Sequence, residues 1–468
     1  MNPPPNPPKN KERLQQIPPV QEILESEALR SIPVAQQYLI KLIREETDRQ
    51  RRQIMAGKQQ GSRAELSRQI IQQVVQKAEK LLKPAMKKVI NATGIILHTN
   101  LGRAPLAPEA LQHLQIAADH YCNLEIELDS GRRGNRVNLV EEIICLITGA
   151  EAALVVNNNA AAILLALTSL ARRREVVVSR GEQVEIGGSF RMPEVMRLSG
   201  ARMVEVGTTN KTHLRDYREA ITAKTGAILK VHTSNYRVMG FTGSVSLPEL
   251  AELCREHDIP LIYDMGSGVI EDLRNWGYPQ EPVARQHVAE GVDVITFSGD
   301  KILGGPQSGI IIGKKNNVQK IKKNHLLRAL RCDKLNYALL DVTLRMYLQP
   351  ENLPERLPVA RLLNRSSDEM QALADKLARL LQELPLQVNI EPAYSEMGSG
   401  ALPLEKIPSL AVTLQPQKGS LAAFSRKLRL ADPAVVGYIE NERLSLNLRT
   451  VREDEIELIA RAVRQVVC

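Results

Sequence analysis

Hydrophobic residues follow two different patterns along the chain, and the change lies near Val89. Before it, apolar residues such as Leu66 and Ile70 recur at helical spacing, and Ser62 with Glu65 has the spacing of a capping box. After it, short apolar runs alternate with helical stretches, which predicts an α/β fold with a largely parallel sheet covered on both faces. The expected strands are residues 152–156, 175–178, 201–206, 227–231, 260–263, 292–297 and 309–312.

The same patterns divide the chain into four segments. Residues 1–19 contain seven prolines and are expected to form a disordered or extended tail. Residues 20–75 are expected to form a small helical domain, whose C-terminal boundary the sequence places only to within several residues. Residues 76–340 then form the large α/β domain, and residues 341–468 form a C-terminal α+β domain.

Charge is concentrated in the first fifth of the chain. Residues 1–90 hold 17 Lys and Arg against 9 Asp and Glu, whereas the remainder holds 45 against 44. This excess suggests a polyanionic partner, although a solvated helix face can also be basic. Tyr38 is the only aromatic residue in this segment, so contacts with the backbone and shape of a folded RNA fit better than base stacking.

Composition sets the expected compartment. The 468 residues are 43% hydrophobic and 25% charged, as in ordinary soluble proteins, and no run of 18 apolar residues occurs. The N-terminus has no apolar signal-peptide core, so we expect a cytoplasmic protein without a membrane partner. The five cysteines have no zinc or redox spacing, and no metal site is expected.

Lys301 is the best candidate for a reactive group. It follows the apolar run 292–297 and is surrounded by Gly304, Gly305 and Gly309 before the next apolar run. Burial at a strand end would lower the pKa of the amine and free its lone pair for imine formation. The alternative is a solvated lysine in a hairpin turn.

Other strand ends carry polar groups that complete a cofactor site. In parallel sheets, ligands bind beyond the carboxyl ends of the strands. The asparagine turn, which is Asn157 to Asn159, can cap a helix and receive a phosphate. An aspartate can hold the proton of a ring nitrogen, and the lysine can form the imine. This order predicts pyridoxal 5'-phosphate. The candidate ligands are Asn158, Asn159, Ser234, Asn235, Asp264, Ser298 and Lys301.

Three arginines form a second candidate set. Arg103 ends a turn-rich segment before the sheet, and Arg328 and Arg331 are one turn apart on an expected helix. Arginine is suited to bidentate capture of phosphate-like anions. Surface arginines on an exposed helix remain the alternative.

Several of these segments closely resemble the bacterial L-seryl-tRNA(Sec) selenium transferases, also called selenocysteine synthases. The resemblance covers essentially the whole chain, and the Ser-Gly-Asp-Lys run and the first segment are its specific parts. The segments are residues 91–103, 123–136, 157–160, 207–212, 231–235 and 298–307.

The resemblance implies a fold-type I pyridoxal-phosphate enzyme that eliminates the serine hydroxyl of seryl-tRNA(Sec) and adds selenium from selenophosphate. It implies Lys301 as the imine-forming lysine, Asp300 as its catalytic neighbour, and Arg103, Arg328 and Arg331 as the selenophosphate ligands. It also implies a tRNA-binding N-terminal domain and a decamer built as a ring of dimers. The rival is another fold-type I lyase or desulfurase acting on a free amino acid or amino sugar acid, which would have no use for a basic helical domain.

Overall fold

The computed structural model describes residues 12–59, 61–188, 190–236, 238–400, 402 and 405–467. The chain forms two compact units, Met1–Lys88 and Val89–Cys468. Most of the predicted proline-rich tail lies outside the described residues. Within the described residues, no helix is long and apolar enough to cross a membrane.

The first unit is helical, as its periodicity predicts. Its helices are α2 (Val20–Leu24), α3 (Glu27–Arg30), α4 (Gln36–Met55) and α5 (Arg63–Leu82). Buried Ile23, Ile43 and Ile70 belong to one small core. Ser62 and Glu65 form the expected capping box at the start of α5. Helix α5 continues across residue 75, where the sequence placed the domain boundary, and the compact unit ends at Lys88.

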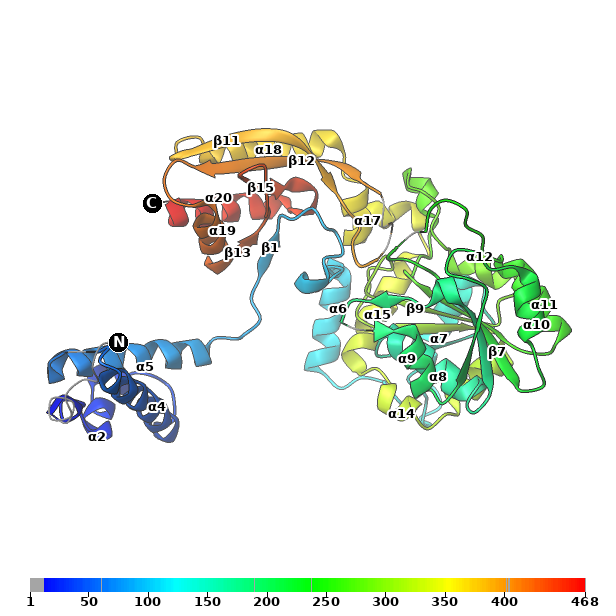
Figure 1. The fold of residues 1–468 in the computed structure, drawn as a ribbon, viewed down its shortest axis with the longest axis horizontal. Helices are drawn as coiled ribbons and strands as arrows, with labels where there is room; N and C mark the ends of the chain where they lie inside the picture. The colour runs from blue at the N-terminus through cyan, green and yellow to red at the C-terminus, as the bar shows by residue number, and fades with distance from the viewer. Residues whose placement is uncertain are drawn as a thin grey trace, which may run out of the picture. The chain divides into compact units, whose positions relative to one another are not determined.

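A seven-stranded sheet organises the second unit (Figure 1). All seven predicted strands are present, within a few residues of the expected bounds, and the prediction of a mostly parallel sheet is confirmed. The exception is β10, which runs antiparallel to both neighbours because it returns from β9 as a hairpin. In spatial order the strands are β2 (Ala152–Val156), β10 (Gly309–Gly313), β9 (Val294–Ser298), β8 (Leu261–Gly266), β7 (Thr225–Val231), β3 (Glu175–Ser179) and β6 (Arg202–Val206).

Helices cover both faces of this sheet because successive strand residues point to opposite sides. Ile295 and Ile310 belong to one core, whereas Val294 and Ile311 belong to the other. The first face packs against α6 (Pro108–Asp119), α7 (Asn138–Thr148), α10 (Leu214–Ala220), α11 (Leu247–Glu256), α12 (Ala284–Ala289) and α15 (Lys334–Met346). The second packs against α8 (Asn159–Leu170), α9 (Met192–Leu198) and α13 (Lys315–Lys322).

The C-terminal part is an α+β layer, also as expected. Its antiparallel sheet has the order β11 (Leu386–Ser395), β12 (Ile407–Pro416), β15 (Arg443–Asn447) and β14 (Tyr438–Glu440). Helices α18 (Ser367–Leu381), α19 (Leu421–Leu430) and α20 (Ile456–Val467) pack on it. Strand β1 (Val89–Asn91) joins this part by pairing in parallel with β13 (Ala434–Val436).

Short elements complete the connections. They are α14 (Leu327–Leu330), α16 (Leu353–Arg356), α17 (Pro358–Leu363), β4 (Glu185–Ile186), β5 (Phe190–Arg191), η1 (Thr99–Leu101), η2 (Arg180–Glu182), η3 (Leu273–Trp276), η4 (Pro350–Asn352), η5 (Leu448–Thr450) and η6 (Glu453–Glu455).

Candidate active site

Lys301 lies in the connection of the β9–β10 hairpin and is only 7% exposed. The turn is held by its own backbone, since Gly305 N–H donates to Gly299 O at 2.8 Å and Gly304 N–H to Lys301 O at 2.9 Å. Burial lowers the pKa of the Lys301 amine, while the negative charge of Asp264 acts in the opposite direction. The reading of Lys301 as a solvated turn residue is therefore wrong, and its amine is suited to act as a nucleophile or base.

Asp264, near the end of β8, is the buried carboxylate of the site. Its Oδ1 accepts hydrogen bonds from Asn159 Nδ2 at 2.8 Å and Thr296 Oγ1 at 3.1 Å. Burial raises the pKa of Asp264, and these two donors oppose the shift. Among the described residues no hydrogen-bond partner faces Oδ2, so this oxygen is available to accept a proton-bearing nitrogen of a ligand.

The asparagine turn joins β2 to helix α8. Asn158 caps the helix by accepting a hydrogen bond from Ala161 N–H at 2.8 Å, and Asn159 holds Asp264. The Oδ1 atoms of Asn157 and Asn159 are buried without a partner. An added Cβ on Gly309 would lie 2.1 Å from Asn158 O, so only glycine lets β10 approach this turn. Free backbone N–H groups at a helix N-terminus suit an anionic group, whereas the two partnerless amide oxygens are acceptors and need a donor.

Three further candidates lie at neighbouring strand ends, with different roles in the structure. Ser234 is buried beyond β7, and Ser298 is buried at the end of β9. A Cβ on Gly268 would lie 2.3 Å from the Ser298 carbonyl, so that backbone is closely packed. Asn235 already donates its amide to Glu185 O at 2.8 Å, which ties it to β4.

Arg103 lies beside the lysine turn. Its Nη1 forms an ion pair with Asp300 Oδ2, and its Nε is buried without a partner. Its backbone is left-handed, with φ at 62°, directly after Gly102. This geometry turns the guanidinium toward Asp300, so two candidates that the sequence treated separately form one pair.

Arg328 and Arg331 line a different cavity of about 410 Å³, which Arg103 does not line. The expected shared helix face is wrong, because α14 ends at Leu330 and Arg331 is extended. Arg331 instead forms a β-bridge with Val156, and Asn157 N–H donates to Leu330 O at 2.9 Å. These two backbone contacts place the cavity beside the asparagine turn. Its lining is Glu125, Asn135, Arg136, Val137, Val155, Lys322, Lys323, Asn324, His325, Leu327, Arg328, Arg331 and Tyr337.

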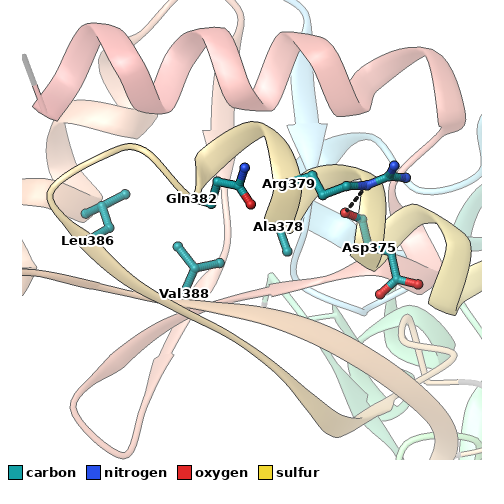
Figure 2. A pocket seen from close by; sticks show the side chains of 6 residues that line it. All are labelled: Asp375, Ala378, Arg379, Gln382, Leu386 and Val388. Carbon is teal, nitrogen blue, oxygen red and sulfur yellow. Dashed lines mark hydrogen bonds between the residues drawn. The ribbon is translucent and has the colours of Figure 1, made fainter.

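A larger groove, of about 660 Å³, lies between α18 and β11 (Figure 2). Arg379 there donates to the backbone oxygen of Asp375 at 3.3 Å, and Leu386 and Val388 form the apolar side. It contains none of the candidate site residues. In the described part of the chain no group of three His, Cys, Asp or Glu is placed to hold a metal ion.

The candidate site residues did not include Thr296, His232 or Glu281. Thr296 pairs in register with Asp264 across β8 and β9, which brings its hydroxyl to the carboxylate. In the sequence Thr296 lies inside an apolar run, so nothing there indicated a polar role. His232 Nε2 lies 3.6 Å from buried Glu281 Oε2. Glu281 comes from a connection without a recognisable motif, and its burial was not predictable.

A family model described as L-seryl-tRNA selenium transferase matches residues 89–452. The chain belongs to this family. It is 44% identical over 456 residues to the L-seryl-tRNA(Sec) selenium transferase of Carboxydothermus hydrogenoformans, covering 97% of each chain. It is 45% identical over 429 residues to that of Nitratidesulfovibrio vulgaris, covering 91% of this chain and 92% of the relative. It is 49% identical over 382 residues to that of Yersinia pestis, covering 80% and 82%.

Among solved structures, D-glucosaminate-6-phosphate ammonia-lyase superposes with a TM-score of 0.56 and 24% identity, covering 83% of this chain and 97% of that one. This likeness shows the fold alone, and the fold is the predicted fold-type I. The family match confirms the resemblance and the enzyme class, a pyridoxal-phosphate-dependent selenium transferase. It does not favour the rival lyase or desulfurase.

Proposed function

We propose that this chain converts seryl-tRNA(Sec) to selenocysteinyl-tRNA(Sec), with selenophosphate as the selenium donor. The observation that carries the proposal is the buried Lys301 amine near Asp264, in a chain whose family is that of the selenium transferases. A desolvated amine near a buried carboxylate is the pair that pyridoxal-phosphate chemistry requires.

The residues present fit pyridoxal 5'-phosphate. Lys301 would bind its aldehyde carbon, and the free Oδ2 of Asp264 would accept the hydrogen of its ring nitrogen. The backbone N–H groups at the N-terminus of α8, where Asn158 caps the helix, would hold its phosphate. Ser234, Asn235 and Ser298 are the further candidate ligands. When bound, the cofactor supplies an electron sink for charge at the substrate Cα.

We assign the proton transfers of the reaction to Lys301, in the turn between β9 and β10. Because burial favours the neutral Lys301 amine, we assign it the removal of the serine Cα proton. The hydroxyl is a poor leaving group and needs a proton at its oxygen as it departs. Asp300 shares Oδ2 with Arg103, so we assign this proton to Lys301, which has just taken one. Asp300 and Arg103 then orient the turn.

The arginine cavity is our candidate for the selenium donor. Arg328 has no ion-pair partner among the described residues, and Arg331 is only loosely paired. Guanidinium groups match the geometry of a phosphate in two-point contacts. Arg103 would serve this anion only by leaving Asp300, so we place the donor chiefly on Arg328 and Arg331.

The N-terminal unit is our candidate for tRNA binding. The net excess of eight positive charges in residues 1–90 supports binding to phosphates, and the two long helices α4 and α5 carry half of that excess. Assembly into a decamer stays a prediction that the resemblance implies.

The test measures selenocysteinyl-tRNA formed by the purified protein from seryl-tRNA(Sec) and selenophosphate. Arg328→Ala should raise the apparent KM for selenophosphate by about one to two decades, because charge-assisted contacts are worth about 1.5–3 kcal/mol. Serine dehydration should be unchanged. Arg345→Ala, which removes an exposed arginine paired with Asp341, is the matched control. A wild-type protein that forms no selenocysteinyl-tRNA refutes the proposal.

A further inference from the structure

The arginine cavity contains a carboxylate that the proposed function does not use. Glu125 is the one acid among the described residues that line it, alongside Arg136, Arg328 and Arg331. It belongs to a hairpin in which Gly134 N–H donates to Glu125 O at 3.1 Å and Ile126 pairs with Arg133. A negative charge fixed in an anion-binding cavity competes with the anion.

Arg136 holds Glu125 firmly. Its Nε donates to Glu125 Oε1 at 2.9 Å, its Nη2 donates to the same oxygen, and its Nη1 donates to Cys332 O at 2.7 Å. Arg136 is only 12% exposed. With these contacts satisfied, Arg136 positions the carboxylate and has little capacity left for an incoming anion.

Arg331 is bound to the same carboxylate only weakly. Its Nη1 lies 3.6 Å from Glu125 Oε1, beyond hydrogen-bond range, and its side chain is 38% exposed. Exposed Arg133 lies equally far, at 3.6 Å from Oε2. Glu125 therefore neutralises part of the field of Arg331 without fixing its position, so Arg331 can turn to another anion.

We propose that Glu125 is a competing ligand that occupies Arg331 when no anion is bound and so sets the affinity of the cavity for phosphate-bearing ligands. The inference rests on the proposed function, in which this cavity binds selenophosphate. A multiply charged phosphate draws Arg331 away from Glu125, which Arg136 holds in place, whereas a small monovalent anion does so poorly. After selenium transfer, the return of Arg331 to Glu125 speeds the release of phosphate.

The experiment measures binding of inorganic phosphate to the full-length, cofactor-loaded protein by isothermal titration calorimetry. Glu125→Gln keeps an oxygen that accepts from Arg136 but removes the charge. It should bind phosphate about three- to tenfold more tightly. Two contributions add up to this gain: Arg331 no longer has to leave a partly exposed ion pair, and the carboxylate no longer repels the phosphate. Glu127→Gln is the matched control, because Glu127 lies on the same hairpin, bonded to Ser130, but does not line the cavity.

The outcomes separate this inference from the proposed function. If Glu125→Gln binds phosphate no more tightly than the wild type, Glu125 does not compete with the anion. The same conclusion follows if Glu127→Gln gains as much phosphate affinity, or if none of the proteins binds phosphate measurably. The gain should also vanish in an Arg331→Ala background, and a gain that persists there overturns the role of Arg331. If Arg328→Ala and Arg331→Ala leave phosphate binding intact while Glu125→Gln still tightens it, the donor-site assignment fails instead.

Discussion

Replacing Gly309 by alanine should disable the asparagine turn while leaving every polar side chain of the site in place. A Cβ at this position would lie 2.1 Å from the backbone oxygen of Asn158, whereas real Cβ atoms stay at about 3.0 Å or more. The turn must therefore move by about 0.9 Å, the difference between these distances, because the obstacle is backbone rather than a flexible side chain.

A shift of that size removes two contacts. The hydrogen bonds Asn158–Ala161 and Asn159–Asp264 are both 2.8 Å long. Stretched by the same amount, each would reach about 3.7 Å and cease to be a hydrogen bond. A bond to a charged acceptor is worth about 1.5–3 kcal/mol, so cofactor affinity should fall by about one to two decades.

The assay titrates cofactor-free protein with pyridoxal 5'-phosphate and follows the absorbance of the bound form. Gly187→Ala is the control, because its Cβ would meet nothing within 4 Å. Chemical unfolding of both variants shows whether Gly309→Ala also loses the roughly 1–3 kcal/mol typical of overpacking. Wild-type cofactor affinity in a folded Gly309→Ala protein would refute the assignment of the phosphate to this turn.

Two further predictions follow from the same structure. Burial raises the pKa of the Asp264 carboxyl in the folded protein above its usual value of 3.8. The neutral carboxyl therefore stabilises the fold fully below pH 3.8, and this stabilisation is lost as the pH rises through the pKa of the folded state. In denaturant titrations at neutral pH, cofactor-free Asp264→Asn should therefore be more stable than the wild type, and the difference in stability should shrink toward pH 3.8. A variant that is less stable than the wild type at neutral pH contradicts this prediction. Deleting residues 1–88, one compact unit, should abolish most tRNA affinity but spare cofactor binding. For the full chain, the logarithm of the binding constant should fall linearly with the logarithm of the salt concentration. Equal tRNA affinity of the truncated protein contradicts the charge argument.

Much of the fold was predictable because buried strands are short apolar runs with polar ends. Strand β2 has the predicted bounds, and Lys301 is buried where glycines and apolar strands surround it. Pairing over long sequence distances was not predictable. The partner of β1 lies at residues 434–436, and nothing in the three residues of β1, Val-Ile-Asn, specifies it.

Site residues were predictable where they follow strands and not where tertiary contacts recruit them. Asp264 lies near the end of β8 and the asparagine turn follows β2, whereas Thr296 becomes a hydrogen-bond donor to Asp264 only through strand register. Arg331 leaves the expected helix because its backbone pairs with Val156. Helical spacing alone does not contain that competing contact.

Reduction with borohydride followed by peptide mapping shows which lysine carries the cofactor. The cofactor-loaded protein is reduced, digested and examined by mass spectrometry. We expect a phosphopyridoxyl group on the peptide containing Lys301, and no such group in a folded, inactive Lys301→Ala protein. A label on another lysine, or a Lys301→Ala protein that is still labelled and active, would contradict this expectation.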